Sequence, residues 1–423
     1  MPTASGPMTE VSWPELAQIV GKEYLRVATA ADAIDGVQVQ RVAEPGTPEE
    51  LARALRWTQA AGLKAAPRGG GTKLGWGNPP AACDLVLSTA RLNRVLEYAW
   101  ADMTVIVEAG CRVSDLQKML AEHGQQLALD PLWPEQATIG GILSTNDSGS
   151  LRARYGSLRD LVIGITVALP DGTLAKSGGK VVKNVAGYDL SKLFTGALGT
   201  LGVIVQAIFR LHPLPRQSRS LSFSGKPESL NQLLLAIQAS KLTFTGLQLR
   251  AAQGNTHLDA RFDGTAPGVE AQVKQVQQIA GSEAVSETPA NVWTSHQAIW
   301  DGATPALLTK FSVLPTQFAA VCARAESAAR AQSLAWKIVV QNVGAGYARF
   351  EGNEQGLRTA LLTLREEIAK LGGTLVALDC PVAVKRGLDV WGAPSDAQPL
   401  MVRVKQRFDP DGTLNPGRFV GGI

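Results

Sequence analysis

Three consecutive glycines, Gly69, Gly70 and Gly71, stand between Arg68 and the pair Thr72-Lys73. Glycine adopts backbone angles that other residues avoid, so such a run can turn several N–H groups toward one concavity. A concavity of this kind binds anionic oxygen, and no side chain stops a phosphate from approaching closely. Arg68 and Lys73 add positive charge. The segment therefore predicts a phosphate cradle, with a flexible surface loop as the alternative.

Two further segments combine glycine with small residues. Residues 137–150 contain the paired glycines Gly140 and Gly141, and residues 196–204 carry three glycines before an alternating strand. Together the three segments suit an extended diphosphate ligand with two ring systems, because irregular segments held by a scaffold often form binding sites. Ordinary turns in a sheet-rich domain are the alternative. The neutral donors and acceptors of the second segment are Thr138, Ser144, Thr145, Asn146 and Ser148.

Several common sites are excluded by their missing motifs. The chain has no P-loop pattern, no Rossmann G-x-G-x-x-G and no G-x-S-x-G nucleophile elbow. Its four histidines are isolated rather than spaced as metal ligands, so we expect no metal site. The cysteines form no C-x-x-C pair, which indicates reduced, mostly buried thiols rather than a disulfide framework or an iron–sulfur ligand set. They are Cys83, Cys111, Cys322 and Cys380.

Length and composition fit a two-domain globular protein. At 423 residues the chain exceeds the size at which one core keeps growing, and 45% apolar with 18% charged residues is an ordinary balance. A net charge of +4 gives no argument for nucleic acid. The start of the chain lacks the pattern of a secretory signal, and no run of about 18 apolar residues occurs. We therefore expect a cytoplasmic protein.

Capping and periodicity indicate the elements that must position the first glycine segment. Thr47-Pro48-Glu49-Glu50 predicts a helix start, and apolar residues then recur at helical spacing until Gly62. A short strand at 64–66 leads directly into the glycines. The segment is therefore expected at the carboxyl end of a strand, where ligands of open α/β sheets commonly bind.

A domain boundary is expected at residues 212–215, where prolines break the strand pattern. Before it, apolar runs predict a helix at 113–120 and strands at 85–87, 104–108, 162–169, 174–176 and 203–211. After it, helices near 228–240, 268–280, 315–333 and 354–371 alternate with strands near 246–250, 336–341 and 345–350. This second pattern is α+β with an antiparallel sheet.

Six segments occur in one order along the chain and together resemble the FAD-binding domain of vanillyl-alcohol oxidase-type (PCMH-type) flavoproteins. They are residues 68–77, 138–149, 154–160, 183–190, 199–204 and 408–417. Residues 183–190 and the overall length resemble most closely the FAD-binding E subunits of bacterial glycolate oxidases. The resemblance covers about residues 28–215 and the final segment.

The resemblance implies an α+β fold, with a two-part FAD-binding domain and a cap domain of antiparallel sheet and helices. We expect a helical lead-in at 1–27, the FAD-binding domain at 28–215, the cap domain at 216–385, and a C-terminal segment at 386–423 that returns to the FAD-binding domain.

The resemblance also assigns a cofactor, FAD, to the three glycine segments. The first would wrap the diphosphate, the second would line the diphosphate and flavin, and the third would meet adenine through backbone groups. Relatives that hold flavin covalently often have histidine where this chain has Thr72, so we expect non-covalent FAD. The residues so assigned are Arg68, Gly69, Gly70, Gly71, Thr72, Lys73, Thr138, Gly140, Gly141, Thr145, Asn146, Ser148, Gly149, Gly202, Val203 and Ile204.

One departure from the family concerns substrate chemistry. Relatives that oxidise 2-hydroxy acids carry a histidine-rich segment in the second domain, which helps hold a metal and orient the substrate. The comparable stretch here, residues 341–350, has no histidine. A general base must accept a proton near neutral pH, and histidine is the usual choice. Arg349, Lys405 and Arg407 are weak candidates for holding a carboxylate, with solvated surface charges as the alternative.

The resemblance therefore predicts an FAD-dependent oxidoreductase subunit of a glycolate oxidase complex, which oxidises glycolate to glyoxylate. The missing histidines favour an accessory flavin role. Because the chain has no cysteine cluster, electrons would leave through partners, a second flavin subunit and an iron–sulfur subunit, which would also provide any contact with the inner membrane. A stand-alone FAD oxidoreductase for another 2-hydroxy acid or alcohol, and a flavin-free structural subunit, are the alternatives.

Overall fold

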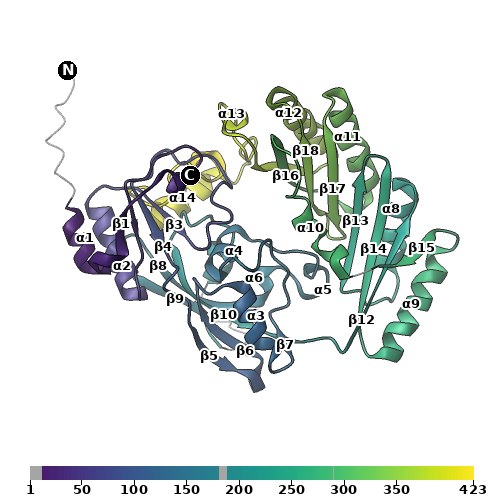
Figure 1. The fold of residues 1–423 in the computed structure, drawn as a ribbon, viewed down its shortest axis with the longest axis horizontal. Coiled ribbons are helices and arrows are strands. Elements are labelled where there is room, and N and C mark those ends of the chain that lie inside the picture. The colour runs from purple at the N-terminus through teal and green to yellow at the C-terminus, as the bar shows by residue number, and fades with distance from the viewer. Residues whose placement is uncertain (1–11, 181–187, 289) are drawn as a thin grey trace.

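The structure is a computed structural model that describes residues 12–180, 188–288 and 290–423. Two bodies lie side by side (Figure 1): a first domain that includes the C-terminal segment, and a cap domain built on a large sheet. Residues 183–187, part of one segment that carries the family resemblance, and residues 1–11 of the expected lead-in lie outside the described residues.

A four-stranded sheet begins the first domain. Its order is β1 (Leu25–Val27), β2 (Arg41–Ala43), β4 (Leu85–Ser88) and β3 (Ala65–Arg68). Strands β2 and β3 both run parallel to β4, because helix α2 (Pro48–Ala60) carries the chain from β2 to β3. This helix begins as predicted at Thr47, whose hydroxyl accepts the Glu50 N–H at 3.1 Å. Helix α1 (Trp13–Val20) packs against α2.

A five-stranded antiparallel sheet completes the first domain. Its order is β5 (Val95–Ala99), β6 (Thr104–Glu108), β10 (Val203–Arg210), β8 (Val162–Ala168) and β9 (Leu174–Gly178). Helices α3 (Val113–Ala121), α4 (Ile139–Thr145), α6 (Leu158–Leu161) and α7 (Leu190–Phe194) contribute apolar side chains to one core with β6, β8 and β10. Short strands β7 (Gln125–Gln126) and β11 (His212–Pro213) pair beside this sheet.

The cap domain is an eight-stranded sheet in which every pair is antiparallel. In spatial order its strands are β15 (Ala284–Glu287), β12 (Gln217–Ser224), β14 (Asn255–Gly264), β13 (Gly246–Ala252), β17 (Ala335–Gln341), β18 (Ala345–Glu351), β16 (Ala306–Ser312) and β19 (Thr374–Asp379). Four helices cover its outer face: α8 (Pro227–Ala239), α9 (Ala266–Ala280), α11 (Phe318–Ala331) and α12 (Glu354–Lys370). Its inner face turns toward the first domain (Figure 1). Helix α10 (Ser295–Ala298) of the cap and helix α5 (Arg152–Tyr155) of the first domain lie on this side of the sheet.

After α13 (Val382–Lys385) and α14 (Gln398–Phe408) the chain returns to the first domain. The Ala65 N–H donates to the Thr413 carbonyl at 2.8 Å, and the Asn415 N–H donates to the Ala65 carbonyl at 2.9 Å. The final segment therefore runs along β3, just before the first glycine segment.

The predicted α+β fold with an antiparallel cap sheet is confirmed. All four cysteines are buried and unpaired, and burial raises their pKa values, that of Cys322 to about 12. Within the described ranges, we find no helix with both the length and the apolar character needed to cross a bilayer.

Candidate functional site

The three glycine segments and the C-terminal segment line one cleft in the first domain, which we call the glycine cleft. The empty space between its walls, including the part that is open to solvent, is about 680 Å³. The lining residues are Pro67, Arg68, Gly69, Gly71, Thr72, Lys73, Leu74, Thr89, Gly140, Gly141, Ser144, Thr145, Leu198, Gly199, Gly202, Val203, Ile204, Asn415 and Arg418. Segments far apart in the sequence thus converge, as one extended ligand requires.

The first glycine segment offers a run of free backbone donors. The N–H groups of five consecutive residues, 69 to 73, make no hydrogen bond to another described residue. A Cβ on Gly70 would lie 1.8 Å from the Gln136 carbonyl oxygen, and one on Gly69 would lie 2.1 Å from Thr138 Oγ1. Gly71 has φ +76°, a left-handed conformation that side-chain-bearing residues rarely adopt. Only glycine fits this path, and the unpaired amides that result are available to an anionic ligand.

The second segment differs from the expected loop, because residues 139–145 form helix α4. The Ile139 N–H donates to the Cys111 carbonyl at 2.9 Å and the Gly140 N–H to the Ala109 carbonyl at 2.7 Å. Thr138 caps the helix by accepting the Gly141 N–H at 3.3 Å. These amides are therefore used within the protein, and the segment lines the cleft with Gly140, Gly141 and the hydroxyl residues Ser144 and Thr145.

Five predicted residues are absent from the lining of the cleft: Gly70, Thr138, Asn146, Ser148 and Gly149. The Ser148 hydroxyl accepts the Leu158 N–H at 3.2 Å, and a Cβ on Gly149 would lie 2.3 Å from the Asp130 carbonyl oxygen. Asn146 ends α4 with φ 48°, and its buried Oδ1 has no partner among the described residues. Ser148 and Gly149 thus contribute to packing within the first domain and not to the lining of the cleft.

The third segment contributes part of the lining of the cleft. Gly202, Val203 and Ile204 line the cleft at the start of β10. A Cβ on Gly202 would lie 2.6 Å from Val167 Cγ1, so close packing on β8 requires glycine. The Leu198 N–H donates to the Ser144 carbonyl at 2.8 Å and ties this segment to α4.

Arg68 and Lys73 do not add free positive charge, which corrects the sequence prediction. Arg68 Nη1 lies 2.7 Å from Asp32 Oδ1. Asp32 also binds Arg26, whose guanidinium holds the pKa of that carboxyl well below its usual range. Lys73 Nζ lies 3.0 Å from Asp147 Oδ2, and both side chains are almost fully buried. Lys73 is therefore neutralised by Asp147, whereas Arg68 shares the single charge of Asp32 with Arg26.

Sequence reasoning missed two residues of the final segment that close the cleft. Asn415 Nδ2 donates to the Leu198 carbonyl at 2.7 Å, and Arg418 donates to the carbonyls of Leu74 and, at 2.7 Å, Trp76. Through these hydrogen bonds they link the final segment to both the first and the third glycine segments. The Asn415-Pro416-Gly417 turn was a visible signal, but its place in the wall depends on the return of the chain along β3.

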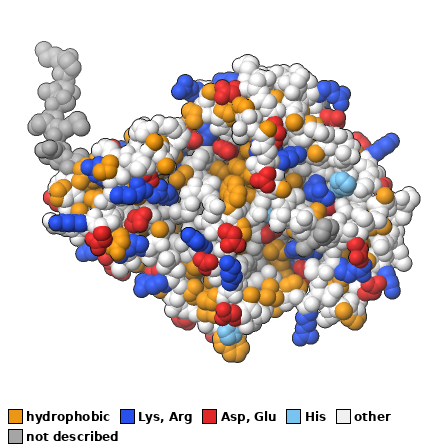
Figure 2. All heavy atoms as spheres, viewed as in Figure 1, with side chains coloured by type: hydrophobic (Ala, Val, Ile, Leu, Met, Phe, Trp, Pro, Cys, Tyr) orange, Lys and Arg blue, Asp and Glu red, His pale blue; other side chains and the backbone are white. Residues whose placement is uncertain are grey.

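An aromatic layer separates the cleft from the cap sheet. Trp300 stacks on Trp76 with ring centroids 5.9 Å apart and meets the edge of Trp133 at 4.8 Å. These rings belong to an apolar cluster that includes Leu308 and Tyr347 of the cap sheet. Figure 2 shows hydrophobic side chains at the centre of the visible face, where the two domains meet.

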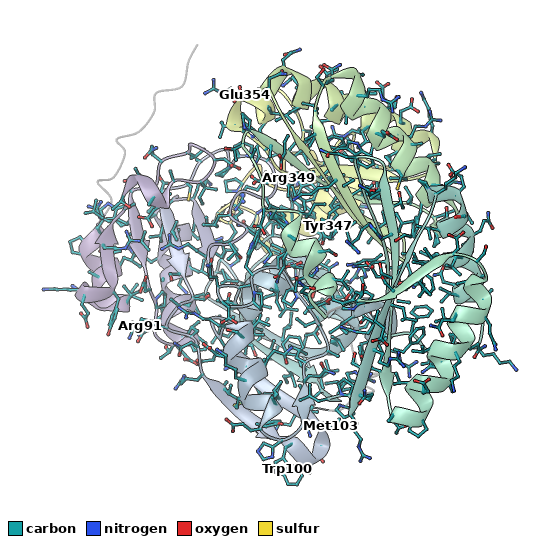
Figure 3. All side chains as sticks on the ribbon, turned by 45° about the vertical axis from the view of Figure 1, so that its right-hand side comes forward. Arg91, Trp100, Met103, Tyr347, Arg349 and Glu354 are labelled. Carbon is teal, nitrogen blue, oxygen red and sulfur yellow. The ribbon has the colours of Figure 1, made fainter. Side chains whose placement is uncertain are left out.

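Arg349, the cap candidate for holding a carboxylate, is engaged by the protein itself. It is 2% exposed, and its guanidinium donates to Glu351 at 2.6 Å and to the carbonyls of Trp300 and Ala303 at 3.0 and 2.6 Å. Figure 3 shows it with Tyr347 on the side of the cap that meets the first domain. Its contacts hold residues 300–303 against the sheet.

The two other weak candidates lie on α14 and outside the lining of the cleft. Lys405 Nζ donates to Thr200, Asp409 and Leu414 at 2.7, 2.6 and 2.9 Å, and so fixes the C-terminal segment. Arg407 is exposed to solvent. The three candidates therefore do not converge on one substrate position.

A second candidate on the inner face of the cap sheet is the titratable pair Lys310 and Tyr347. Lys310 and Tyr347 are cross-strand neighbours, and Lys310 Nζ lies 5.8 Å from the centre of the Tyr347 ring. Burial lowers the pKa of Lys310, while Asp147 of the first domain acts to raise it. A lysine in such surroundings is a candidate proton acceptor.

Comparisons with known proteins agree with the fold and the cleft. Residues 39–178 match the family described as FAD binding domain. The chain is 36% identical to glycolate oxidase subunit GlcD of Bacillus subtilis (strain 168) over 180 residues, which are 43% of this chain and 38% of that protein. It is 27% identical to the mitochondrial D-lactate dehydrogenase [cytochrome] of Arabidopsis thaliana over 415 residues, covering 89% and 72% of the two chains.

Solved structures show the same architecture. Substrate-bound p-cresol methylhydroxylase superposes with a TM-score of 0.73 at 14% identity and covers 96% of this chain and 95% of its own. The 4-ethylphenol oxidase from Gulosibacter chungangensis gives 0.74 at 15% identity with the same coverage. At these identities the likeness concerns the fold.

The chain is a flavoprotein with a PCMH-type FAD-binding domain and the vanillyl-alcohol oxidase-type fold. Its cofactor is FAD, and the proteins it is similar to include hydroxy acid dehydrogenases. The glycine cleft fits the cofactor, since five unpaired amides suit a diphosphate. The matched segment spans only 38% of the length of GlcD.

Proposed function

We propose that this chain is the FAD-holding E-type subunit of a glycolate oxidase complex and takes part in oxidising glycolate to glyoxylate. The observation that carries the proposal is the glycine cleft with its free amides, in a chain similar to a glycolate oxidase subunit. Bound FAD accepts a hydride and releases single electrons. The residues of this chain hold the cofactor and exclude water from it.

Two features support non-covalent FAD and an accessory role. No histidine or cysteine, the usual tethering side chains, occurs among the described residues that line the cleft. Residues 341–350 carry no histidine, and Arg349 is engaged by the cap itself. We propose that electrons pass to an iron–sulfur partner within a cytoplasmic complex that also contains a second flavin subunit.

Anaerobic mixing of the purified chain with glycolate tests this role. The accessory role predicts that the chain takes up FAD and stays yellow when glycolate is added alone. Co-expression with the other subunits should restore rapid bleaching of its flavin. Rapid bleaching of the isolated chain would refute the accessory role, and failure to take up FAD would refute the flavoprotein assignment.

A stand-alone oxidoreductase for another 2-hydroxy acid is the second candidate, and Lys310 is the observation that favours it. A lysine with a lowered pKa can act as general base, a role that histidine fills elsewhere. Relatives include proteins named D-lactate and D-2-hydroxyglutarate dehydrogenase. This candidate predicts dye reduction by the isolated chain with D-lactate or D-2-hydroxyglutarate, and loss of that activity in Lys310→Met.

A further inference from the structure

Arg418 is a third cation in the lining of the glycine cleft, and it differs from Arg68 and Lys73. Those two residues are paired with Asp32 and Asp147. Arg418 is 3% exposed and forms no ion pair with any carboxylate of the described chain. Its Nη atoms bind only neutral oxygens, and its buried Nε has no partner among the residues that the structure describes.

The nearest candidate for a counter-charge inside the protein is already used. Asp35 acts on Arg418 only through its field, and its carboxylate binds Lys385 Nζ at 2.9 Å. A buried guanidinium without an anionic partner is unfavourable, because carbonyl oxygens replace only part of the hydration it loses. Burial accordingly lowers the pKa of Arg418. The apo-protein therefore holds an uncompensated positive charge at the cleft.

The position of Arg418 suits an anion held by the first glycine segment. Its guanidinium binds the carbonyls of Leu74 and Trp76, at the end of that segment, and Nη1 lies 3.4 Å from Asn415 Oδ1. Asn415 in turn binds Leu198 of the third segment. A planar guanidinium pairs well with phosphate oxygens, and such charge-assisted bonds are about twice as strong as neutral ones.

We propose that Arg418 supplies the positive charge that balances the FAD diphosphate, while the amides of residues 69–73 supply its hydrogen bonds. This inference rests on the proposed FAD binding and adds the residue that provides its electrostatic part. Arg68 and Lys73, the basic residues beside the glycines, serve mainly to fix the surrounding backbone through Asp32 and Asp147.

Binding measurements with fragments of the cofactor test the proposal. Apo-protein of the full chain is titrated with FAD, with ADP, which keeps the diphosphate, and with riboflavin, which keeps only the ring system and ribityl chain. Arg418→Gln should bind FAD and ADP about 10- to 100-fold more weakly, as expected for loss of a hydrogen bond to a charged group. Riboflavin affinity should stay within about twofold of wild type, since that ligand carries no phosphate.

Two further variants separate charge from structure. Arg418→Lys keeps the charge and should retain more ADP affinity than Arg418→Gln, which removes it. Arg403→Gln changes an exposed residue of α14 and should match wild type in every titration. The rise in melting temperature on adding ADP gives a second readout, and it should shrink in Arg418→Gln and persist in Arg418→Lys.

Two results would overturn the inference while leaving the proposed function intact: equal ADP affinity in wild type and Arg418→Gln, or an equal loss of ADP and riboflavin affinity. If Arg418→Gln does not fold, Arg418→Lys decides, and ADP affinity as weak as that of an unfolded control overturns the proposal. Wild-type protein that binds neither FAD nor ADP would refute the proposed function itself.

Discussion

The glycine cleft and the inner face of the cap sheet lie next to each other but differ in how their polar groups are used. In the cleft, five successive N–H groups have no acceptor among the described residues, and one guanidinium has no anionic partner there. On the cap face the guanidinium of Arg349 is engaged by the protein, whereas Lys310 and the buried indole N–H of Trp300 have no hydrogen-bond partner among the described residues. The contrast teaches that this chain is built first to hold an anionic cofactor, and much less to hold a small acid.

The largest loss in the free energy of unfolding is expected for Lys73→Met. Asp147 is fully buried and would lose its cation, which typically costs about 3–5 kcal/mol of the free energy of unfolding. Urea unfolding of the FAD-free protein measures this. Lys192→Met, which breaks an exposed pair with Asp189, is the matched control and should cost less than about 1 kcal/mol. Equal costs would contradict a stabilising role for the buried pair.

Arg349→Gln tests whether the cap face is structural. The variant loses bonds to Glu351, Trp300 and Ala303, so we expect a loss of about 2–3 kcal/mol in the free energy of unfolding. FAD affinity should be unchanged, because Arg349 does not line the cleft. A variant with normal stability but a raised KM for a hydroxy acid would instead make the cap a substrate site.

Gly70→Ala tests the backbone of the cleft. The added Cβ would meet the Gln136 carbonyl, and overpacking of this kind costs about 1–3 kcal/mol. Since the amides of residues 69–73 must shift, FAD affinity should fall about 10-fold or more by isothermal titration. Gly179→Ala has open space and should bind FAD like wild type. Normal FAD binding in Gly70→Ala would contradict the assignment of the amides.

Asp32→Asn should give the smallest loss in the free energy of unfolding, and the size of this loss should depend on pH. The folded-state pKa of Asp32 is depressed by Arg26, so this carboxylate contributes stability above its unfolded pKa of about 3.9 and loses that contribution as pH falls below it. We expect a difference of about 1–2 kcal/mol between wild type and variant at pH 7. Thermal unfolding from pH 7 to pH 3 should show this difference shrinking; a constant difference would contradict it.

Much of the fold could be predicted because local signals agreed with the final packing. The N-cap at Thr47, the strand before Gly69 and the alternation in β10 are each present as expected. In the cap, helices were predicted well, but strands β12, β14, β15, β16 and β19 were not. Strands β12, β15, β16 and β19 pair with strands that are distant in sequence, so local composition gave little sign of the pairing. Strand β14 instead forms a tight hairpin with β13, and its turn at Gln253-Gly254 was missed.

The sequence by itself determined where small residues permit a close approach to phosphate, because a glycine run acts through its own backbone. Tertiary structure alone decided which groups remain free to bind. It used the amides of α4 for capping, paired Arg68 and Lys73 with carboxylates from distant segments, and brought Arg418 back along β3. The reason is physical: a charge or an N–H is available to a ligand only when no neighbour in space already satisfies it, and the order of residues along the chain does not list those neighbours.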